Sequence, residues 1–347
     1  MSCVVVTGAR GFVGSVLTRR LLDQGVGGRK VERVVLMDLE FDVPPADARV
    51  VPLAGSIAEA PVRAQAFRQP VDFVFHLASV PGGAAEKNYA LGRSINLDAT
   101  LGLLEDLRHQ RNLQHPPPRF VFASTVAVYG APLPALVDEA TLPAPRLSYG
   151  AHKLAGEILV ADATRLGWVE GCSLRLPGVV ARPGDGAGMM SAFMSQLFWK
   201  LAAGERLTVP VSPQATAWWI SVGTCVDNLL HAATIDPARL DAPRSYQMPL
   251  LHLSVGELVE AMAVQYGADR RDLVRYAPDE FIERNFGAYP PLQAPKAESL
   301  GFRHDGTISN LIARAIGHGP LHDPLHDPLH DSSHDSLHDP AHERKLA

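Results

Sequence analysis

The sequence predicts an α/β fold: a doubly wound parallel sheet followed by a smaller C-terminal substrate lobe. Two observations predict it. Short runs rich in β-branched and aromatic residues alternate with segments long enough for a helix, and the alternation loosens after about Pro177 into proline-rich loops. The 347 residues, 46% hydrophobic and 20% charged, can bury a large core. This balance excludes a fibrous or largely unfolded protein.

Five strands are expected in the first 176 residues, each an apolar run separated from the next by a segment that can form a crossover helix. Two more helices are expected in the second lobe. A parallel sheet covered on both faces binds its ligands at the carboxyl ends of the strands, so the site is expected there. The expected strands are 3–7, 33–37, 73–76, 120–123 and 172–176, and the expected helices are 14–22, 96–108, 190–203 and 254–266.

The chain is expected to divide into two domains and a tail. Residues 1–176 should form the first domain, with 216–235 returning to it, and residues 177–318 most of the second. In the tail, 319–347, Leu-His-Asp recurs at a four-residue spacing and prolines interrupt any helix, so it is expected to be disordered. Its histidines and carboxylates could hold a divalent metal weakly, but a solvated repeat accounts for them as well, and no metal site is predicted.

Several classes of protein are disfavoured by simple counts. No run of about 18 apolar residues is present, as a membrane span would need, and no basic segment precedes the first apolar run. A net charge of −5 disfavours nucleic-acid binding, and the three cysteines show no paired spacing. A cytoplasmic protein with a small-molecule substrate is expected.

A glycine-rich turn predicts the cofactor. The first strand leads into Thr7-Gly8-Ala9-Arg10-Gly11-Phe12-Val13-Gly14 and then a helix, the Rossmann-type arrangement in which a pyrophosphate lies on the helix N-terminus. We expect Gly8, Gly11, Phe12, Val13 and Gly14 to contact it. The next strand ends at Asp38, whose carboxylate would bind the ribose hydroxyls and repel a 2′-phosphate, which favours NAD. Arg10 beside the turn leaves NADP open.

A phenol and an ammonium, Tyr149 and Lys153, stand at i and i+4 of an expected helix, and hence on one face. A nearby ammonium favours the phenolate, so Lys153 is expected to lower the pKa of Tyr149 and make it a general base. The strand at 120–123 ends in Ser124 and Thr125, whose hydroxyls could hold a substrate oxygen against the phenol.

Together these motifs resemble the extended short-chain dehydrogenases/reductases, the NAD-dependent epimerase/dehydratase family, over nearly the whole body of the chain. The resemblance implies that Thr125 is the catalytic hydroxyl, with Ser124 in reserve. It also implies that Lys153 binds the nicotinamide ribose, that Ala78 and Asn96 lie near the cofactor or the catalytic relay, and that Pro177 and Val179 lie near the nicotinamide. The matching segments are 7–14, 75–78, 96–100, 124–130, 148–153 and 174–179.

The substrate is expected to be a small sugar acid. Nucleotide-sugar members of the family carry an asparagine where this chain has Gly178, so a polar group for a diphosphate is missing. The chain resembles the branch that contains D-erythronate dehydrogenase, which implies NAD-dependent oxidation of a C2 hydroxyl to a 2-oxo acid. Arg182 is the candidate anchor for the carboxylate, with a structural ion pair or a cofactor contact as the alternative. Ser79, Thr125 and Tyr149 are the other expected substrate contacts.

Three alternatives stay open at this point. An L-threonine 3-dehydrogenase-like activity also fits residues 175–178, and Asp185 could then face an amine. A nucleotide-sugar epimerase or dehydratase and a non-enzymatic NAD-sensing protein are the others. Helices 96–108 and 149–166 carry wide apolar stripes, and relatives pair such helices, so a homodimer is expected.

Overall fold

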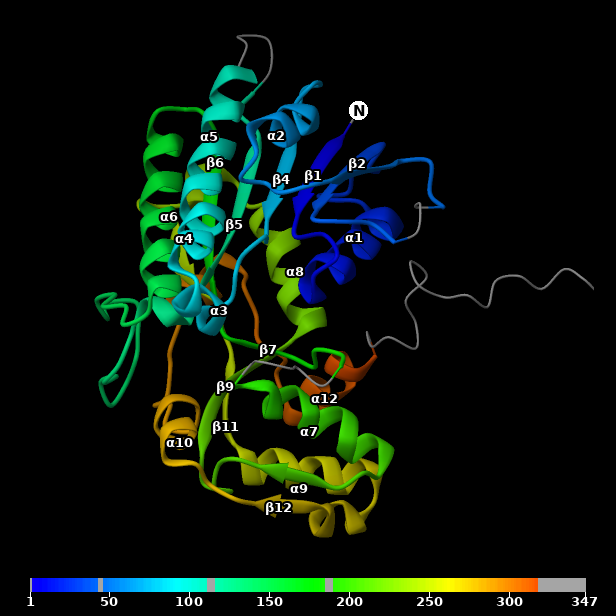
Figure 1. Ribbon diagram of the computed structural model, residues 1–347, viewed down its shortest axis with the longest axis vertical. Helices are drawn as coiled ribbons and strands as arrows, with labels where there is room; N and C mark the ends of the chain where they lie inside the picture. Colours follow the sequence, from blue (N-terminus) through cyan, green and yellow to red (C-terminus); the bar gives the residue numbers. More distant parts are fainter. Residues whose placement is uncertain (1, 43–45, 111–115, 185–189, 318–347) are drawn as a thin grey trace, which may run out of the picture.

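A seven-stranded sheet forms the centre of the larger lobe in the computed structural model (Figure 1), which describes residues 2–42, 46–110, 116–184 and 190–317. Its strand order is β10-β6-β5-β4-β1-β2-β3, and every pairing in it is parallel. The tail predicted at 319–347 and Asp185 lie outside the described residues. The strands are β1 (Cys3–Thr7), β2 (Arg33–Asp38), β3 (Val50–Ala54), β4 (Phe73–His76), β5 (Arg119–Thr125), β6 (Glu170–Leu176) and β10 (Ser245–Gln247).

Helices cover both faces of this sheet, with α5 and α6 on one side and α1 and α8 on the other (Figure 1). The alternation of side chains along each strand fills the two cores: in β1, Val4 and Val6 join the α1 and α8 side, while Cys3 and Val5 join the other. The doubly wound α/β fold is thereby confirmed. The helices of this lobe are α1 (Phe12–Gln24), α2 (Ala60–Ala66), α3 (Gly82–Lys87), α4 (Tyr89–Arg93), α5 (Ala99–Gln110), α6 (Ser148–Arg165) and α8 (Val222–Ala232), with a π-helical turn at Ser94–Asp98 before α5.

The second lobe lies beyond the carboxyl ends of the strands and has a core of its own. A three-stranded sheet of order β11-β9-β7 and a two-stranded sheet of β12 and β8 pack there against helices. Its elements are β7 (Gly178–Val180), α7 (Ala192–Ala203), β8 (Leu207–Val209), β9 (Thr216–Ser221), β11 (Leu251–Ser254), α9 (Val255–Tyr266), β12 (Val274–Tyr276), α10 (Glu280–Phe286) and α12 (Ile308–Ile316). The helix α11 (Pro295–Leu300) instead packs on the core of the larger lobe through Ala297 and Leu300.

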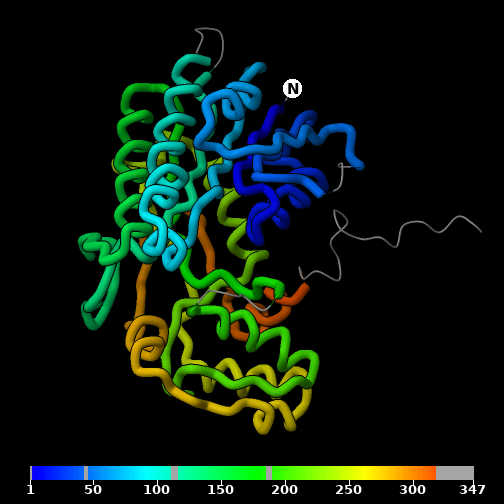
Figure 2. The backbone as a smooth tube through the Cα atoms, in the orientation of Figure 1, coloured from blue at the N-terminus to red at the C-terminus, as the bar shows by residue number. Residues whose placement is uncertain are grey.

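The chain passes between the lobes several times, as the tube in Figure 2 shows. β9 pairs with β7 and β11 in the smaller sheet, whereas α8, directly after it, packs on α1, and β10 extends the large sheet beyond β6. We therefore propose a division in which residues 222–232 and 245–247 belong to the first domain. In the described part of the chain, no helix is both long and apolar enough to cross a membrane.

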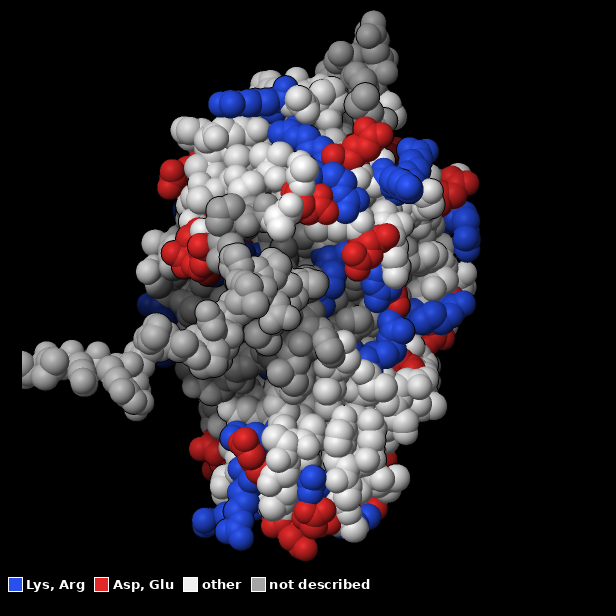
Figure 3. Space-filling view, turned by 90° about the vertical axis from the view of Figure 1, so that its right-hand side faces the viewer, with Lys and Arg blue, Asp and Glu red and all other residues white. Residues whose placement is uncertain are grey.

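Charged side chains of both signs are intermixed over the face shown in Figure 3. No group of three or more histidine, cysteine or acidic side chains placed to hold a metal ion occurs among the residues that the structure describes.

Candidate active site

A cavity of about 920 Å³ lies at the carboxyl ends of β1, β2, β4, β5 and β6 and is closed on its far side by β7 and α7. Most of the residues predicted from the sequence line this one cavity. Asn96 and Lys153 are the two that do not. Those that line it are Gly8, Gly11, Phe12, Val13, Gly14, Asp38, Ala78, Ser79, Ser124, Thr125, Tyr149, Pro177, Val179 and Arg182.

The glycine turn forms a cradle in which side chains have no room. Gly8 has a φ of +68°, and a Cβ added there would lie 2.8 Å from the backbone of Ala78. A Cβ on Gly14 would lie 2.1 Å from the carbonyl oxygen of Gly8. The helix that follows, α1, has no side-chain cap and no acidic residue in its first turn, so its amino end suits a pyrophosphate. These residues fit the dinucleotide.

Asp38 lies half-buried at the end of β2 and accepts backbone N–H groups from Arg10 and Leu39, each at 2.8 Å. These bonds fix the carboxylate at the edge of the cavity. The guanidinium of Arg10, which left NADP open in the sequence, donates to the carbonyl of Glu40 at 3.1 Å and pairs with the Asp42 carboxylate. Acidic partners therefore surround the group that would bind a 2′-phosphate, which is consistent with NAD.

The hydroxyl of Tyr149, in the first turn of α6, lies near the hydroxyls of Thr125 at the end of β5 and Ser79 after β4, which act on it as hydrogen-bond partners. Burial raises the pKa of Tyr149, while these two hydrogen bonds and the positive charge of Arg182 act to lower it. The Thr125 hydroxyl also accepts the N–H of Ala127 at 3.1 Å, which orients it. Three elements thus bring together one phenol and two hydroxyls.

The position of Lys153 differs from the expectation that its ammonium lowers the pKa of Tyr149. It is only 1% exposed, its Nζ lies 4.7 Å from the centre of the Phe122 ring, and burial lowers its own pKa to about 7. It does not contribute to the pKa of Tyr149, which is raised rather than lowered. The i, i+4 spacing does place both residues on one face of α6, but that face packs on the sheet, and Lys153 lies one turn deeper than the cavity wall.

The side chain of Ser124 belongs to a separate network of buried hydrogen bonds. Its hydroxyl donates to Glu157, whose carboxylate is held by Arg175 through bonds of 2.7 and 3.0 Å, and Arg175 also donates to the phenol of Tyr129 at 3.1 Å. Glu157 is 3% exposed. This buried ion pair was not predicted from the sequence, where Glu157 is one of several polar residues, with His152 and Lys153, in the helix that follows Tyr149.

Asn96 lies in the π-helical turn and is fully buried. Its amide accepts the N–H of Val80 at 2.7 Å and donates to the carbonyl of Val80 at 3.0 Å. It therefore fixes the loop that carries Ala78 and Ser79, behind the cavity wall.

Arg182 lies on the opposite wall, exposed to the cavity, with its guanidinium carbon 5.6 Å from the centre of the Phe12 ring. Loss of surrounding water lowers its pKa, and no carboxylate pairs with it among the described residues. Ser191 and Ser195 of the α7 region also line the cavity and had no sequence signal.

Comparison with known proteins identifies the family of the chain. Residues 4–247 match the model of the NAD dependent epimerase/dehydratase family. D-erythronate dehydrogenase from Cupriavidus necator is 35% identical over 315 residues, which cover 89% of this chain and 96% of that protein. The enzyme of that name from Haemophilus influenzae is 29% identical over 90% and 98%.

A solved structure shares the whole architecture. The nucleoside-diphosphate-sugar epimerase from Agrobacterium tumefaciens has a TM-score of 0.86 at 32% identity, over 93% of this chain and 96% of that one. The family match spans the glycine turn, Asp38, Thr125 and Tyr149. The chain therefore belongs to the NAD dependent epimerase/dehydratase family and is an NAD-dependent oxidoreductase.

Proposed function

We propose that the protein oxidises the C2 hydroxyl of a small, D-erythronate-like sugar acid to the 2-oxo acid, with NAD as the electron acceptor. The observation that carries this proposal is the pairing of two features in one cavity. The Tyr149 phenol with its two hydroxyl partners lies on one wall, and an arginine without a carboxylate partner among the described residues lies on the other. Similarity to two D-erythronate dehydrogenases supports it.

Each residue then has a chemical role. Arg182 would bind the substrate carboxylate through its planar guanidinium. Thr125 and Ser79 would orient the C2 oxygen, and Tyr149, as the phenolate, would accept the proton of the C2 hydroxyl while two electrons leave C2 as hydride. NAD supplies the hydride acceptor when it is bound along the glycine turn and Asp38. The carbon is oxidised from alcohol to ketone.

The surroundings of Gly178 support a small substrate over a nucleotide sugar. A Cβ at this position would lie 2.7 Å from the Cε of Met194 and 2.7 Å from the carbonyl oxygen of Trp218. An asparagine at this position, the residue that nucleotide-sugar members carry, has no room for its side chain. A diphosphate subsite built on that residue is therefore absent from the described cavity wall.

The proposal is tested with a panel of four- and five-carbon sugar acids, L-threonine and nucleotide sugars, followed by the absorbance of NADH. Turnover should be highest with a 2-hydroxy sugar acid. Turnover of threonine alone would instead indicate the threonine dehydrogenase alternative, and NAD binding without turnover of any compound would indicate a sensor. Arg182→Gln should raise KM for the acid and leave KM for the corresponding uncharged alcohol unchanged.

Tyr149→Phe tests the general base. It removes the proton acceptor and keeps the ring, so kcat should fall by about 100-fold or more, while the dissociation constant of NAD changes by less than about threefold. Unchanged turnover would show that another group accepts the proton.

We also infer a homodimer that uses α5 and α6. Leu101 on α5 and Ile158 on α6 are 39% and 64% exposed, which suits a helix-to-helix interface. Sedimentation of wild type and Ile158→Glu would test it, since the charged variant should sediment as a monomer. The cytoplasmic location stays a prediction.

A further inference from the structure

His76, the last residue of β4, is fully buried, and the proposed chemistry does not use it. Its Nδ1 lies 2.7 Å from the hydroxyl of Thr7, and its Nε2 lies 2.9 Å from the hydroxyl of Thr100. The rings of Phe120 and Phe122 flank the imidazole at centroid distances of 6.0 and 5.6 Å. An imidazole in such surroundings needs both ring nitrogens partnered, and the two threonines provide the partners.

The bonds of Thr7 determine where the imidazole proton is. Its hydroxyl oxygen accepts the N–H groups of Leu77 and Ala78, each at 3.2 Å, and the Leu77 N–H is shared with the backbone carbonyl of Thr7, also at 3.2 Å. A hydroxyl has two acceptor positions and one proton, so the proton of Thr7 is donated to Nδ1 of His76. Nδ1 is then an acceptor, and the proton of a neutral imidazole is on Nε2.

The hydrogen bonds on the Nε2 side of His76 run in the same donor-to-acceptor direction. Nε2–H of His76 donates to Thr100, and the Thr100 hydroxyl donates to the carbonyl of Asn96 at 3.0 Å. Burial and the nearby Lys153 hold the pKa of His76 well below its usual range, so the imidazole is neutral. Each hydrogen bond in the series Thr7–His76–Thr100–Asn96 therefore has one donor and one acceptor.

Both ends of this chain attach to the wall of the cavity. Thr7 holds the backbone of Leu77 and Ala78, and Ala78 is the residue against which Gly8 packs so closely. Asn96, whose backbone carbonyl ends the chain, holds Val80 through both atoms of its side-chain amide. Between them lies Ser79, whose hydroxyl reaches Tyr149. The segment 77–80 is thus fixed at both ends by groups that His76 joins.

We propose that His76, held as the Nε2–H tautomer, is a positioning residue that fixes segment 77–80 in the conformation that receives NAD. It acts through Thr7 and Thr100. The opposite tautomer would direct a third N–H at the Thr7 hydroxyl and leave the proton of that hydroxyl without an acceptor among the described residues. This role of His76 in NAD binding does not depend on which substrate the enzyme oxidises.

Paired variants at Thr100 test the role. Thr100→Val keeps the shape and removes the acceptor of Nε2–H, and Thr100→Ser keeps the hydroxyl. The dissociation constant of NAD, measured by titration of the folded protein without substrate, should rise by about fivefold or more in Thr100→Val. It should stay within about twofold of wild type in Thr100→Ser. If Thr100→Val melts at a lower temperature but binds NAD like wild type, His76 has a structural role alone and the proposal is wrong.

The tautomer is tested directly on the wild-type protein, so the proposal does not depend on a variant that folds. In nitrogen NMR of ¹⁵N-histidine-labelled protein, with His76→Gln used to assign the signal, Nδ1 should show the shift of an unprotonated nitrogen and Nε2 that of a protonated one near neutral pH. A signal for the Nδ1–H tautomer or for imidazolium would overturn the proposal. If the enzyme oxidised no sugar acid, the proposed function would be wrong, but both of these tests would still apply because neither uses substrate.

Discussion

Replacing Lys153 with methionine should stabilise the protein, and the gain should shrink as the pH rises. The ammonium is 1% exposed and lies against the Phe122 ring, and burial lowers its pKa from 10.5 to about 7. Methionine has a similar length and no charge, so it can fill the same space.

The sign and size follow from the two pKa values. The unfolded chain keeps the lysine proton up to about pH 10.5, whereas the folded chain releases it above about pH 7. Between these values the unfolded state binds more protons, so the stability of the folded wild-type protein rises with pH. From pH 7 to pH 9 the gain is about 2 kcal/mol. Lys153→Met has no such proton, and its advantage over wild type should shrink by this amount.

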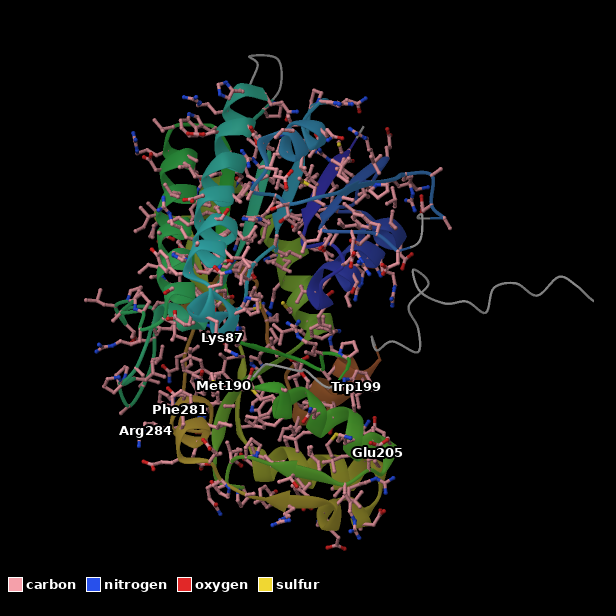
Figure 4. The ribbon with its side chains drawn as sticks, viewed as in Figure 1. Lys87, Met190, Trp199, Glu205, Phe281 and Arg284 are labelled. Carbon is pink, nitrogen blue, oxygen red and sulfur yellow. The ribbon has the colours of Figure 1, made fainter. Side chains whose placement is uncertain are left out.

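Urea unfolding at pH 7 and pH 9 measures the effect as a difference between variant and wild type, in which other titrating groups cancel. The matched control is Lys87→Met. Lys87 is exposed on α3 where the lobes meet (Figure 4), so its replacement should give no pH-dependent difference. An advantage of Lys153→Met that is the same at both pH values, or absent, would mean that the lysine is charged and solvated in the folded protein.

Four further substitutions test the roles of single residues. Asp38→Asn should reduce the preference for NAD over NADP about tenfold, because one carboxylate near a 2′-phosphate is removed; an unchanged ratio of kcat/KM would exclude Asp38 from cofactor choice. Thr125→Val should lower kcat strongly. Ser124→Ala should leave kcat unchanged but lower the free energy of unfolding by about 1–3 kcal/mol, because Glu157 loses a buried hydrogen-bond donor. Equal losses of kcat in the two variants would contradict the assignment of Thr125 as the catalytic hydroxyl. Gly178→Ala should destabilise the protein by about 1–3 kcal/mol in urea unfolding, because its Cβ has no room.

Elements whose signals are local could be predicted from the sequence. The strands at 3–7 and 73–76 were predicted with the bounds of β1 and β4, because each is an apolar run that stops at a turn. β3 was missed. Pro52 within it argues against a strand, but β3 is the edge strand of the sheet and pairs only with β2, so the proline costs no hydrogen bond to a further neighbour.

Features that depend on distant contacts could not be predicted. β10 has three residues and pairs with β6, from which it is separated by β7, α7, β8, β9 and α8, so no local pattern marks it. The partner of Ser124 is Glu157, 33 residues away. Helical spacing predicted that Tyr149 and Lys153 share a face, but it could not show that burial, more than mutual charge, governs both pKa values.

The electrostatic support for a Tyr149 phenolate must therefore come from other groups. Hydrogen bonds from Thr125 and Ser79 and the charge of Arg182 are the influences that lower its pKa, against burial. Under the proposed function Arg182 also pairs with the substrate carboxylate, which would cancel much of its charge at the phenol. The two hydroxyls would then carry most of the stabilisation of the phenolate in the complex with substrate. This places the fixed geometry of segment 77–80, which carries Ser79, at the centre of the chemistry and links it to the hydrogen-bond chain through His76.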